Sequence, residues 1–533
     1  MKIDTEQPHT EEHEEPTGEV ISDRQPYLLR SGGGVRTVAD NFAEFKKTAG
    51  RFKLPRTVTE RLRLHIFQEF LELTNPEVGG SFVFNDSPER LPLPWQTIMN
   101  YLYDRGVINS PHLPNTLPFN DGPKVFSFAL HAVFNRDQTD GFSRISGYTR
   151  GIATDFEEAI SKVIGELLER YPLTQYRRKK FLRASVRTLA AKGKSFLNPF
   201  DLAGFADWQK ELFPERRFDE HSTFFWVEGT ELLSGTPALI PAQLVFWNYQ
   251  TRQEPHEPYL REQNTNGAAG HFTRDEAILA AIYENIQRDA FLIYWLNVIA
   301  PPKIDQTTIE DERIQRLIEQ FTRYSFEVVF LNTTLDLGVP SCICVLINRS
   351  GGGPKIAIGG GCDSNLANAL LRSATEVIGV YHWLLETKGQ FELRKDYQSF
   401  RDHQVGQLER LLLWSSADMF CHLESFLSGP NQSFRQAAAD FPHQFQSPAQ
   451  ELQYVMRLFG KLGKGYELYA YRAQHELLET LGYCSVRVII PALVPLYLNE
   501  AAAPLGALRL REVPLKVGYQ PAKAFNPWPH PFP

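Results

Sequence analysis

The chain has 533 residues, of which 42% are hydrophobic and 22% are charged, and its formal net charge is −7. This length exceeds one ordinary hydrophobic core, so two or three subdomains are expected, and the composition is that of a globular protein. The negative net charge argues against nucleic acid as the main partner, and no apolar run reaches the ~20 residues that span a bilayer, so no membrane partner is expected.

The N-terminal part divides into two predicted segments. Residues 1–40 are rich in Glu and Pro and are predicted to form a disordered acidic tail. Residues 41–123 are predicted to form a mostly helical N-terminal region, because Thr57 and Glu60 fit a capping box ahead of apolar residues at helical spacing. No basic segment followed by an apolar one opens the chain, and five cysteines make no disulfide framework, so we expect a cytoplasmic protein.

Residues 124–533 mix strand and helix patterns and are predicted to form one large domain. Strands are predicted at residues 124–134, 221–233 and 238–249, and as a pair around a turn within residues 325–348. Helices are predicted at residues 152–171, 273–295, 364–385 and across much of 398–460, with a final mixed section after residue 484. Because the strands and helices do not alternate regularly, we predict an α+β fold with mixed sheets rather than a doubly wound parallel sheet.

Three of the predicted helices carry acidic residues among apolar ones. Glu166 and Glu169 are three residues apart and share a helix face, with Ser161 five residues before the first of them. The second helix has Glu276, Glu284, Gln287 and Arg288, and the third has Arg372 and Glu376. Each group alone fits a solvated helix face with a surface ion pair. Carboxylates that converge from separate helices would instead suit Mg²⁺, which prefers oxygen ligands and bridges to phosphates.

Familiar nucleotide and nucleophile motifs are absent. The chain has no GxxxxGK[ST] loop, and its glycine triplets are not GxGxxG, so they are interpreted as turns. It also has no GxSxG nucleophile elbow. A nucleotide site, if present, must therefore use a different arrangement.

Several segments, in a consistent order, resemble the YcaO family of ATP-dependent peptide-modifying enzymes. SGYTRGIATDFEEAISKVIGELLERY is similar to the family's glycine turn followed by S-x-x-x-x-E-x-x-E-R, and NTNGAAGHFTRDEAILAAIYENIQRDAF is similar to its E-x-x-E-R-D helix. NLANALLRSATEVIG resembles the family's A-L-x-R-A-x-T-E segment, and the sections from residue 478 onward resemble its C-terminal part. The resemblance spans residues 125–533 and implies a YcaO-type fold.

The resemblance also implies a nucleotide site without a P-loop, in which Mg²⁺ and ATP are the cofactors. The positions that match the family's metal ligands are Glu166, Glu169, Glu276, Glu284 and Gln287. The positions that match its nucleotide-contacting residues are Arg150, Ser161, Arg288, Arg372 and Glu376. Two positions depart from the pattern: Gln287 stands where the family has a second Glu, and Gly379 stands where a Gln often follows. Gln287 keeps a carbonyl oxygen but lacks the negative charge.

The family's reaction converts Cys, Ser or Thr residues of a ribosomal peptide into thiazoline or oxazoline rings, with ATP activating the amide oxygen. Family members with this activity end in alternating prolines that reach the active site, and this chain ends in a Pro-rich segment, residues 527–533. Pro529, Pro531 and Pro533 are therefore expected to form part of the catalytic site. His530 between them is a candidate proton carrier, although a structural role is an equal alternative.

The implied partners are a precursor peptide and a separate E1-like or leader-binding protein, since residues 41–110 lack the hairpin-then-helices pattern of a leader-binding winged helix. A flavin dehydrogenase and a homodimer are further candidates. Two alternatives remain open: another YcaO chemistry, such as thioamide or macroamidine formation, and a non-catalytic docking scaffold, which the departures at Gln287 and Gly379 motivate.

Overall fold

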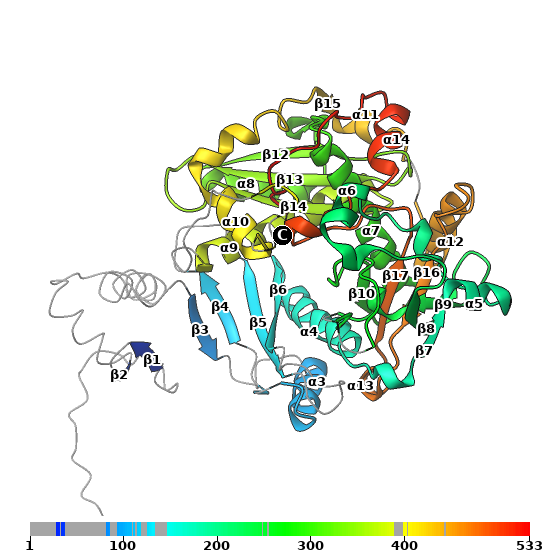
Figure 1. The fold of residues 1–533 in the computed structure, drawn as a ribbon. Helices are drawn as coiled ribbons and strands as arrows, with labels where there is room; N and C mark the ends of the chain where they lie inside the picture. Colours follow the sequence, from blue (N-terminus) through cyan, green and yellow to red (C-terminus); the bar gives the residue numbers. More distant parts are fainter. Residues whose placement is uncertain are drawn as a thin grey trace, which may run out of the picture. The chain divides into compact units, whose positions relative to one another are not determined.

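The structure is a computed structural model (Figure 1). It describes residues 28–31, 34–37, 81–85, 93–108, 110–111, 114–118, 125–133, 146–247, 249–252, 255–387, 398–401, 403, 405–441 and 444–532. The chain separates into two compact units, residues 1–80 and residues 81–533. Among the described residues, no helix is long and apolar enough to cross a membrane.

In the first unit the structure describes one hairpin. Strands β1 (Leu28–Ser31) and β2 (Gly34–Thr37) pair in antiparallel fashion. The prediction of disorder is therefore wrong for these two strands, which lie within residues 1–40. Composition averaged over the whole segment does not reveal two four-residue strands that pair with each other. The capping box predicted at Thr57 and Glu60 lies outside the described residues.

The second unit begins with a four-stranded antiparallel sheet, which contradicts part of the predicted helical region 41–123. The order is β3-β4-β5-β6, with β3 (Ser81–Asn85), β4 (Pro114–Pro118), β5 (Phe126–Val133) and β6 (Ser146–Ala153). Among the described residues of that region only α3 (Leu93–Asp104) is an α-helix. The segment 114–118 has no strand-like alternation; it becomes a strand because it pairs with β5.

A six-stranded sheet occupies a second part of this unit. Its order is β10-β17-β16-β8-β7, with β9 also paired to β8. The strands are β7 (Leu182–Ser185), β8 (Thr223–Glu231), β9 (Thr236–Pro241), β10 (Ala268–His271), β16 (Tyr469–Arg472) and β17 (Cys484–Ile489). Because β10 pairs with β17, residues near position 268 lie beside residues near position 487.

A five-stranded sheet forms the third part, in the order β14-β13-β12-β11-β15. Its strands are β11 (Lys303–Asp305), β12 (Phe326–Asn332), β13 (Ser341–Asn348), β14 (Ile356–Cys362) and β15 (Asn431–Ser433). All eight residues of β13 are buried, because the two faces of the sheet pack on different clusters. Cys342 and Cys344 lie with helix α9 (Leu366–Thr387), while Ile343 and Val345 lie with the C-terminal half of helix α7 (Arg274–Leu296).

Three long helices connect these sheets to the site. They are α4 (Phe156–Leu173), α7 (Arg274–Leu296) and α9 (Leu366–Thr387). Shorter helices in the described residues are α5 (Val186–Ala191), α6 (Asp207–Leu212), α8 (Glu312–Arg323), α10 (Gln407–Ser415), α11 (Phe434–Ala438), α12 (Pro448–Phe459), α13 (Glu476–Leu481) and α14 (Arg509–Lys516). The α+β prediction is confirmed: every ladder is antiparallel in the described sheets except that between β11 and β15.

The C-terminal segment is packed within the domain. Phe532 is fully buried, and the end of the chain lies among β14, α10 and α7 (Figure 1). Backbone N–H of Asn526 donates to the carbonyl of Leu296 at the end of α7, and Phe532 contacts Phe291 with ring centroids 5.0 Å apart. The tail therefore runs back along α7 from its end toward its middle.

Candidate functional site

Three strand–helix pairs build the site in the same way. In the pairs β6–α4, β10–α7 and β14–α9, a glutamate on the helix accepts a hydrogen bond from a backbone N–H at or beside the preceding strand. The bonds join Arg150 N to Glu166, Gly267 N to Glu284 and Gly360 N to Glu376, each at 2.7 Å and spanning 16, 17 and 16 residues respectively. Each N–H holds one carboxylate oxygen, so the other oxygen can face an arginine or a ligand.

Glycines in the first and third pairs bring the helix close to its strand. A Cβ at Gly151 of β6 would lie 2.0 Å from the carbonyl oxygen of Ala159 in α4, and a Cβ at Gly361 of β14 would lie 2.0 Å from that of Ala369 in α9. Any other residue would push the helix away from its strand. These glycines are therefore required for the glutamates to reach the strand amides.

The faces of the three helices line one cavity of about 2020 Å³. The lining includes the pinned glutamate of each helix and the residue three positions after it, which is Glu169 in α4, Gln287 in α7 and Gly379 in α9. Residues of α8 and of the first turns of α9 also line the cavity. The same helical position thus presents a carboxylate, an amide and no side chain in the three pairs.

Arginines lie beside the carboxylate oxygens that the strand N–H groups do not hold. Arg170 Nη2 is 2.6 Å from Glu166 Oε1, and Arg288 Nη2 is 3.4 Å from Glu284 Oε1 and 4.0 Å from Glu376 Oε1. Arg372 on α9 pairs instead with the buried Asp363, at 3.2 Å. The cavity therefore holds both signs of charge close together, as a site for a metal-bound polyanion requires.

Burial makes the acidic side of the cavity electrostatically strained. Burial raises the pKa of Glu169 to about 8, and the carboxylates of Glu284 and Glu166 add to the rise, while Arg170 and Arg487 oppose it. Burial likewise raises the pKa of Glu376, against the nearby Arg288 and the Gly360 N–H. Carboxyl groups whose pKa is raised by burial favour the binding of a cation that compensates their charge.

The donor set fits Mg²⁺. In the part of the chain that the structure describes, no three carboxylate, imidazole or thiol groups are gathered closely enough to hold a metal by protein ligands alone. Mg²⁺ usually takes one or two carboxylates and completes its shell with water and substrate phosphates. Oxygen-only donors beside unpartnered arginine N–H groups are consistent with that arrangement.

A match to a family model shows which family this chain belongs to. The model of the YcaO cyclodehydratase family, described as ATP- and Mg²⁺-binding, matches residues 150–494. The chain belongs to the YcaO family. The resemblance recognised in the sequence is thereby confirmed, and the matched range runs from Arg150 in β6 across the rest of the three strand–helix pairs.

Solved YcaO-type structures have the same fold at low sequence identity. A heterocyclase solved in complex with substrate and cofactor is 19% identical, with a TM-score of 0.64, over 85% of this chain and 59% of that chain. The heterocyclase TruD is 20% identical, with a TM-score of 0.55, over 93% of this chain and 69% of that one. YcaO from Methanopyrus kandleri, bound with AMPPCP and Mg²⁺, is 16% identical, with a TM-score of 0.54, over 77% of this chain and 94% of that chain.

Two curated relatives are each 28% identical over 160 residues. One is an uncharacterized protein in the tfuA 3′ region of Rhizobium leguminosarum bv. trifolii, matched over 28% of this chain and 37% of its own length. The other is an uncharacterized protein of Methanothermobacter thermautotrophicus, matched over 30% of this chain and 41% of its own length. The chain spans about two fifths of the length of these relatives.

The structure brings most of the predicted YcaO site residues together. Those that line the cavity are Arg150, Ser161, Glu166, Glu169, Glu284, Gln287, Arg372 and Glu376. Arg288 lies against two of the glutamates, as described above. These positions were predicted from the resemblance to the YcaO family, and their roles as metal or nucleotide ligands stay predictions.

Glu276 is not brought to the cavity. It lies in the first turn of α7, where its carboxylate contacts His271 at 2.8 Å and the hydroxyl of Thr273, the residue that caps the helix. Eight residues separate it from Glu284, or about 12 Å along the helix axis. At 100° per residue Glu276 lies only about 20° from Gln287 around the helix, but this angle takes no account of the distance along the axis.

The C-terminal prolines lie beside the site rather than in it. Pro529 and Pro531 are buried, and Pro533 lies outside the described residues. The indole N–H of Trp295 donates to the carbonyl of Trp528 at 3.2 Å, and that of Trp414 donates to the carbonyl of Pro529 at 2.8 Å. Beyond these anchors, the Phe532 ring lies 4.3 Å from the guanidinium carbon of Arg288, so the tail contacts the site through this one residue.

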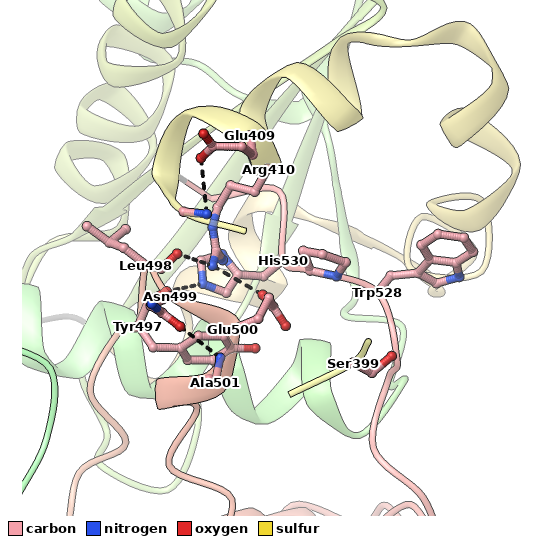
Figure 2. Close-up of polar contacts among 12 residues, drawn as sticks. Ser399, Glu409, Arg410, Tyr497, Leu498, Asn499, Glu500, Ala501, Trp528 and His530 are labelled. Atoms are coloured by element: carbon pink, nitrogen blue, oxygen red, sulfur yellow. Dashed lines mark hydrogen bonds and ion pairs between the residues drawn. The ribbon is translucent and has the colours of Figure 1, made fainter. Parts of the chain in front are cut away.

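His530 is placed as a structural residue. It is fully buried, does not line the cavity, and its Nε2 is 2.7 Å from the carbonyl oxygen of Tyr497 (Figure 2). Since a carbonyl only accepts, Nε2 carries the proton. Burial, aided by the charge of the nearby Arg410, lowers the pKa of His530 well below its usual value. This placement favours the structural alternative over a proton carrier.

Sequence reasoning missed three charged residues at or beside the site. Arg487 on β17 is buried and interacts electrostatically with Glu284 and Glu169, and burial lowers its pKa to about 10. Asp363 holds Arg372. Nothing in the local sequence marks Arg487, because its approach to the glutamates depends on the pairing of β17 with β10. Arg170, directly after Glu169, could have been found from the E-R pair itself.

Proposed function

We propose that this chain catalyses ATP-dependent cyclodehydration of Cys, Ser or Thr residues in a ribosomally made precursor peptide, which yields thiazoline or oxazoline rings. The observation that carries the proposal is one cavity lined by a pinned glutamate from each of three helices, with arginines at the free oxygens. Its volume of about 2020 Å³ exceeds the roughly 300–1,000 Å³ of an ordinary ligand pocket, which leaves room for a nucleotide and a peptide together.

The proposed reaction needs ATP because an amide oxygen is a poor leaving group. The side-chain thiol or hydroxyl adds to the preceding amide carbon and loses its proton, and the resulting oxyanion attacks the γ-phosphorus as ADP leaves. The C–O bond then breaks with release of phosphate, and the amide nitrogen loses its proton as the C=N bond forms. The peptide loses one water for each ATP consumed.

The chain's own residues would position and stabilise these steps. Glu166, Glu169, Glu284 and Glu376 would hold Mg²⁺, which when bound neutralises charge on the phosphate chain. Arg288, with Nε and Nη1 buried and without partners among the described residues, can donate to phosphoryl oxygens. The strand N–H groups keep the glutamates oriented, so little reorganisation accompanies the transfer.

The test is to incubate the purified chain with ATP, Mg²⁺ and a candidate precursor peptide that contains Cys, Ser and Thr, together with any leader-binding partner. Loss of one water per ring, matched by one phosphate released, is the expected result. Replacement of an amide oxygen by sulfur would identify thioamide formation instead, and peptide binding without ATP turnover would identify a docking scaffold. A matched Glu284→Gln variant should bind the peptide but release no phosphate.

A further inference from the structure

A buried arginine of the six-stranded sheet lies close to the carboxylates of the site. Arg487 is 2% exposed and belongs to β17, which pairs with β10 on one side and with β16 on the other. Its Nη1 donates a hydrogen bond to the carbonyl oxygen of Asn264, a residue that lines the cavity. The central strand and this hydrogen bond together fix where the guanidinium lies.

The alternation of β17 turns Arg487 toward helix α4. Residues two apart in a strand lie on the same face. Ser485, two residues before Arg487, donates its hydroxyl to the backbone carbonyl of Glu169 at 2.9 Å. Arg487 therefore lies on the face of the sheet that packs against the helix carrying Glu169.

The pairing of β17 with β10 brings Arg487 to a second glutamate. Arg487 lies opposite Ala268 in the ladder, and the N–H of the preceding residue, Gly267, holds Glu284 at 2.7 Å. Burial lowers the pKa of Arg487 to about 10, and Glu284 and Glu169 are the two groups that oppose the fall. One buried cation thus interacts with a carboxylate on α4 and with a carboxylate on α7.

The two carboxylates need a counter-charge in the absence of a metal ion. Glu166 forms an ion pair with Arg170 and Glu284 forms one with Arg288, but Glu169 forms none with any described residue. The Glu284 carboxylate helps to raise the pKa of Glu169, which shows that the two groups repel each other. A cation that interacts with both therefore relieves a repulsion that the ion pairs on the helices leave.

A neighbouring arginine offers a comparison. Arg261 is 6% exposed, and burial lowers its pKa to about 9, with the charge of Arg487 adding to the fall. No carboxylate among the described residues opposes that fall or pairs with Arg261. The two arginines are thus both buried, and the interaction with carboxylates distinguishes Arg487.

We propose that Arg487 is the fixed counter-charge of Glu169 and Glu284 in the metal-free protein, and that it keeps Mg²⁺ from binding to these carboxylates until nucleotide phosphates accompany the ion. Because Arg487 is held on a central strand, its charge stays in place and repels an approaching cation. The phosphates supply the further oxygen ligands and negative charge that Mg²⁺ then needs. Arg487 is a positioning residue, and this inference rests on the proposed function and assigns the order in which metal and nucleotide bind.

A purely structural role predicts the opposite sign. If Arg487 only joined β17 to the carbonyl of Asn264, Arg487→Met would loosen the site and weaken the binding of Mg²⁺. If Arg487 is a counter-charge, the same variant binds Mg²⁺ more tightly in the absence of nucleotide. Protons compete for the exposed carboxylate charge, but Mg²⁺ carries two charges and gains more than a proton does from the loss of the arginine.

The experiment follows the melting temperature of the full chain in a Mg²⁺ series without nucleotide, and AMPPCP binding by calorimetry in the same series. Arg487→Met should melt lower than the unaltered chain in Mg²⁺-free buffer, and Mg²⁺ alone should stabilise it at a concentration about tenfold or more lower. Arg487→Lys, which keeps the charge, should keep the Mg²⁺ midpoint of the unaltered chain. Arg261→Met is the matched control and should also leave that midpoint unchanged.

An unchanged or higher Mg²⁺ midpoint in Arg487→Met would overturn the assignment of Arg487. A midpoint that falls equally in Arg261→Met would overturn it as well, because the effect would then not depend on the carboxylates. If Arg487→Met does not melt cooperatively, Arg487→Gln, which keeps a donor for Asn264 and loses the charge, gives the same decision. Failure of the unaltered chain to bind AMPPCP at any Mg²⁺ concentration would reject the proposed function, whereas the series with Mg²⁺ alone tests Arg487 without a nucleotide.

Discussion

Replacing Arg509 with Met should destabilise the domain through one buried carboxylate. Arg509 Nε and Nη2 donate to the two carboxylate oxygens of Asp289 at 2.9 and 2.6 Å, and the same guanidinium donates to Asp336 at 2.7 and 3.1 Å. Asp289 is fully buried and directly follows Arg288, and it also accepts the N–H of Val494 at 2.9 Å. The variant leaves this carboxylate without a counter-charge.

Removing one partner of such a pair costs about 3–5 kcal/mol. Residues 81–533 form the compact unit that holds the pair, and about 450 residues at roughly 2.1 cal/mol/K each give an unfolding entropy near 1 kcal/mol/K. The melting temperature should therefore fall by about 3–5 °C. Asp289→Asn with Arg509→Met should recover part of the loss, because a neutral amide needs no counter-charge.

The stability that Arg509→Met loses should increase as pH rises. Burial raises the pKa of Asp289 even with Arg509 present, so the folded state binds its proton more tightly than the unfolded state does. Such a group costs stability as pH rises above the ordinary Asp value near 3.9. Without Arg509 the rise in pKa is larger, so the deficit of the variant should be greater at pH 8 than at pH 5.

Circular dichroism melts of the unaltered chain, both single variants and the double variant at these two pH values make the measurement. A melting temperature of Arg509→Met equal to that of the unaltered chain would refute the reasoning. So would strictly additive effects in the double variant, because the two side chains would then not act on each other.

Three further predictions concern the site. Glu169→Gln should raise the melting temperature in Mg²⁺-free buffer, and the gain should grow as pH rises toward the raised pKa of about 8. The reason is that the Glu169 carboxyl lowers the stability of the folded state over that pH range. Melts at pH 5 to 9 make the measurement, and a gain that shrinks with rising pH would contradict this. Gly360→Ala should abolish AMPPCP binding in calorimetry, because the new Cβ would lie 1.7 Å from Gln287 Nε2 and 2.8 Å from Phe532. Gly352→Ala, where no atom lies within 4 Å of the new Cβ, should leave AMPPCP binding intact. Retained affinity in Gly360→Ala would disprove the contact. Phe532→Ala should lower the free energy of unfolding by the roughly 3–5 kcal/mol typical of a buried Phe and should weaken AMPPCP binding. Trp414→Phe, which loses one donor to the tail, should fall between this variant and the unaltered chain. An unaffected affinity in Phe532→Ala would separate the tail from the site.

Local pattern was enough to place the main helices, whereas the site residues on them came from the resemblance to the YcaO family. Glu166 and Glu169, three residues apart, were predicted to share a helix face, and both line the cavity. Helical periodicity is a property of neighbouring residues, so it can be read before the fold is known. The strand pair around Gly338 likewise follows from alternating apolar residues that flank a turn.

Tertiary structure alone decided which of these groups act together. Glu276 has the residue type and nearly the angle of a ligand, but its position eight residues earlier along α7 commits it to the helix cap. Arg487 has no local signal and reaches the glutamates only because β17 pairs with β10, more than 200 residues away. His530 has the chemistry of a proton carrier, yet packing beside Arg410 and Tyr497 buries it as a neutral anchor. Residue type and period are encoded locally, whereas burial and distance between charges depend on contacts made across the whole chain.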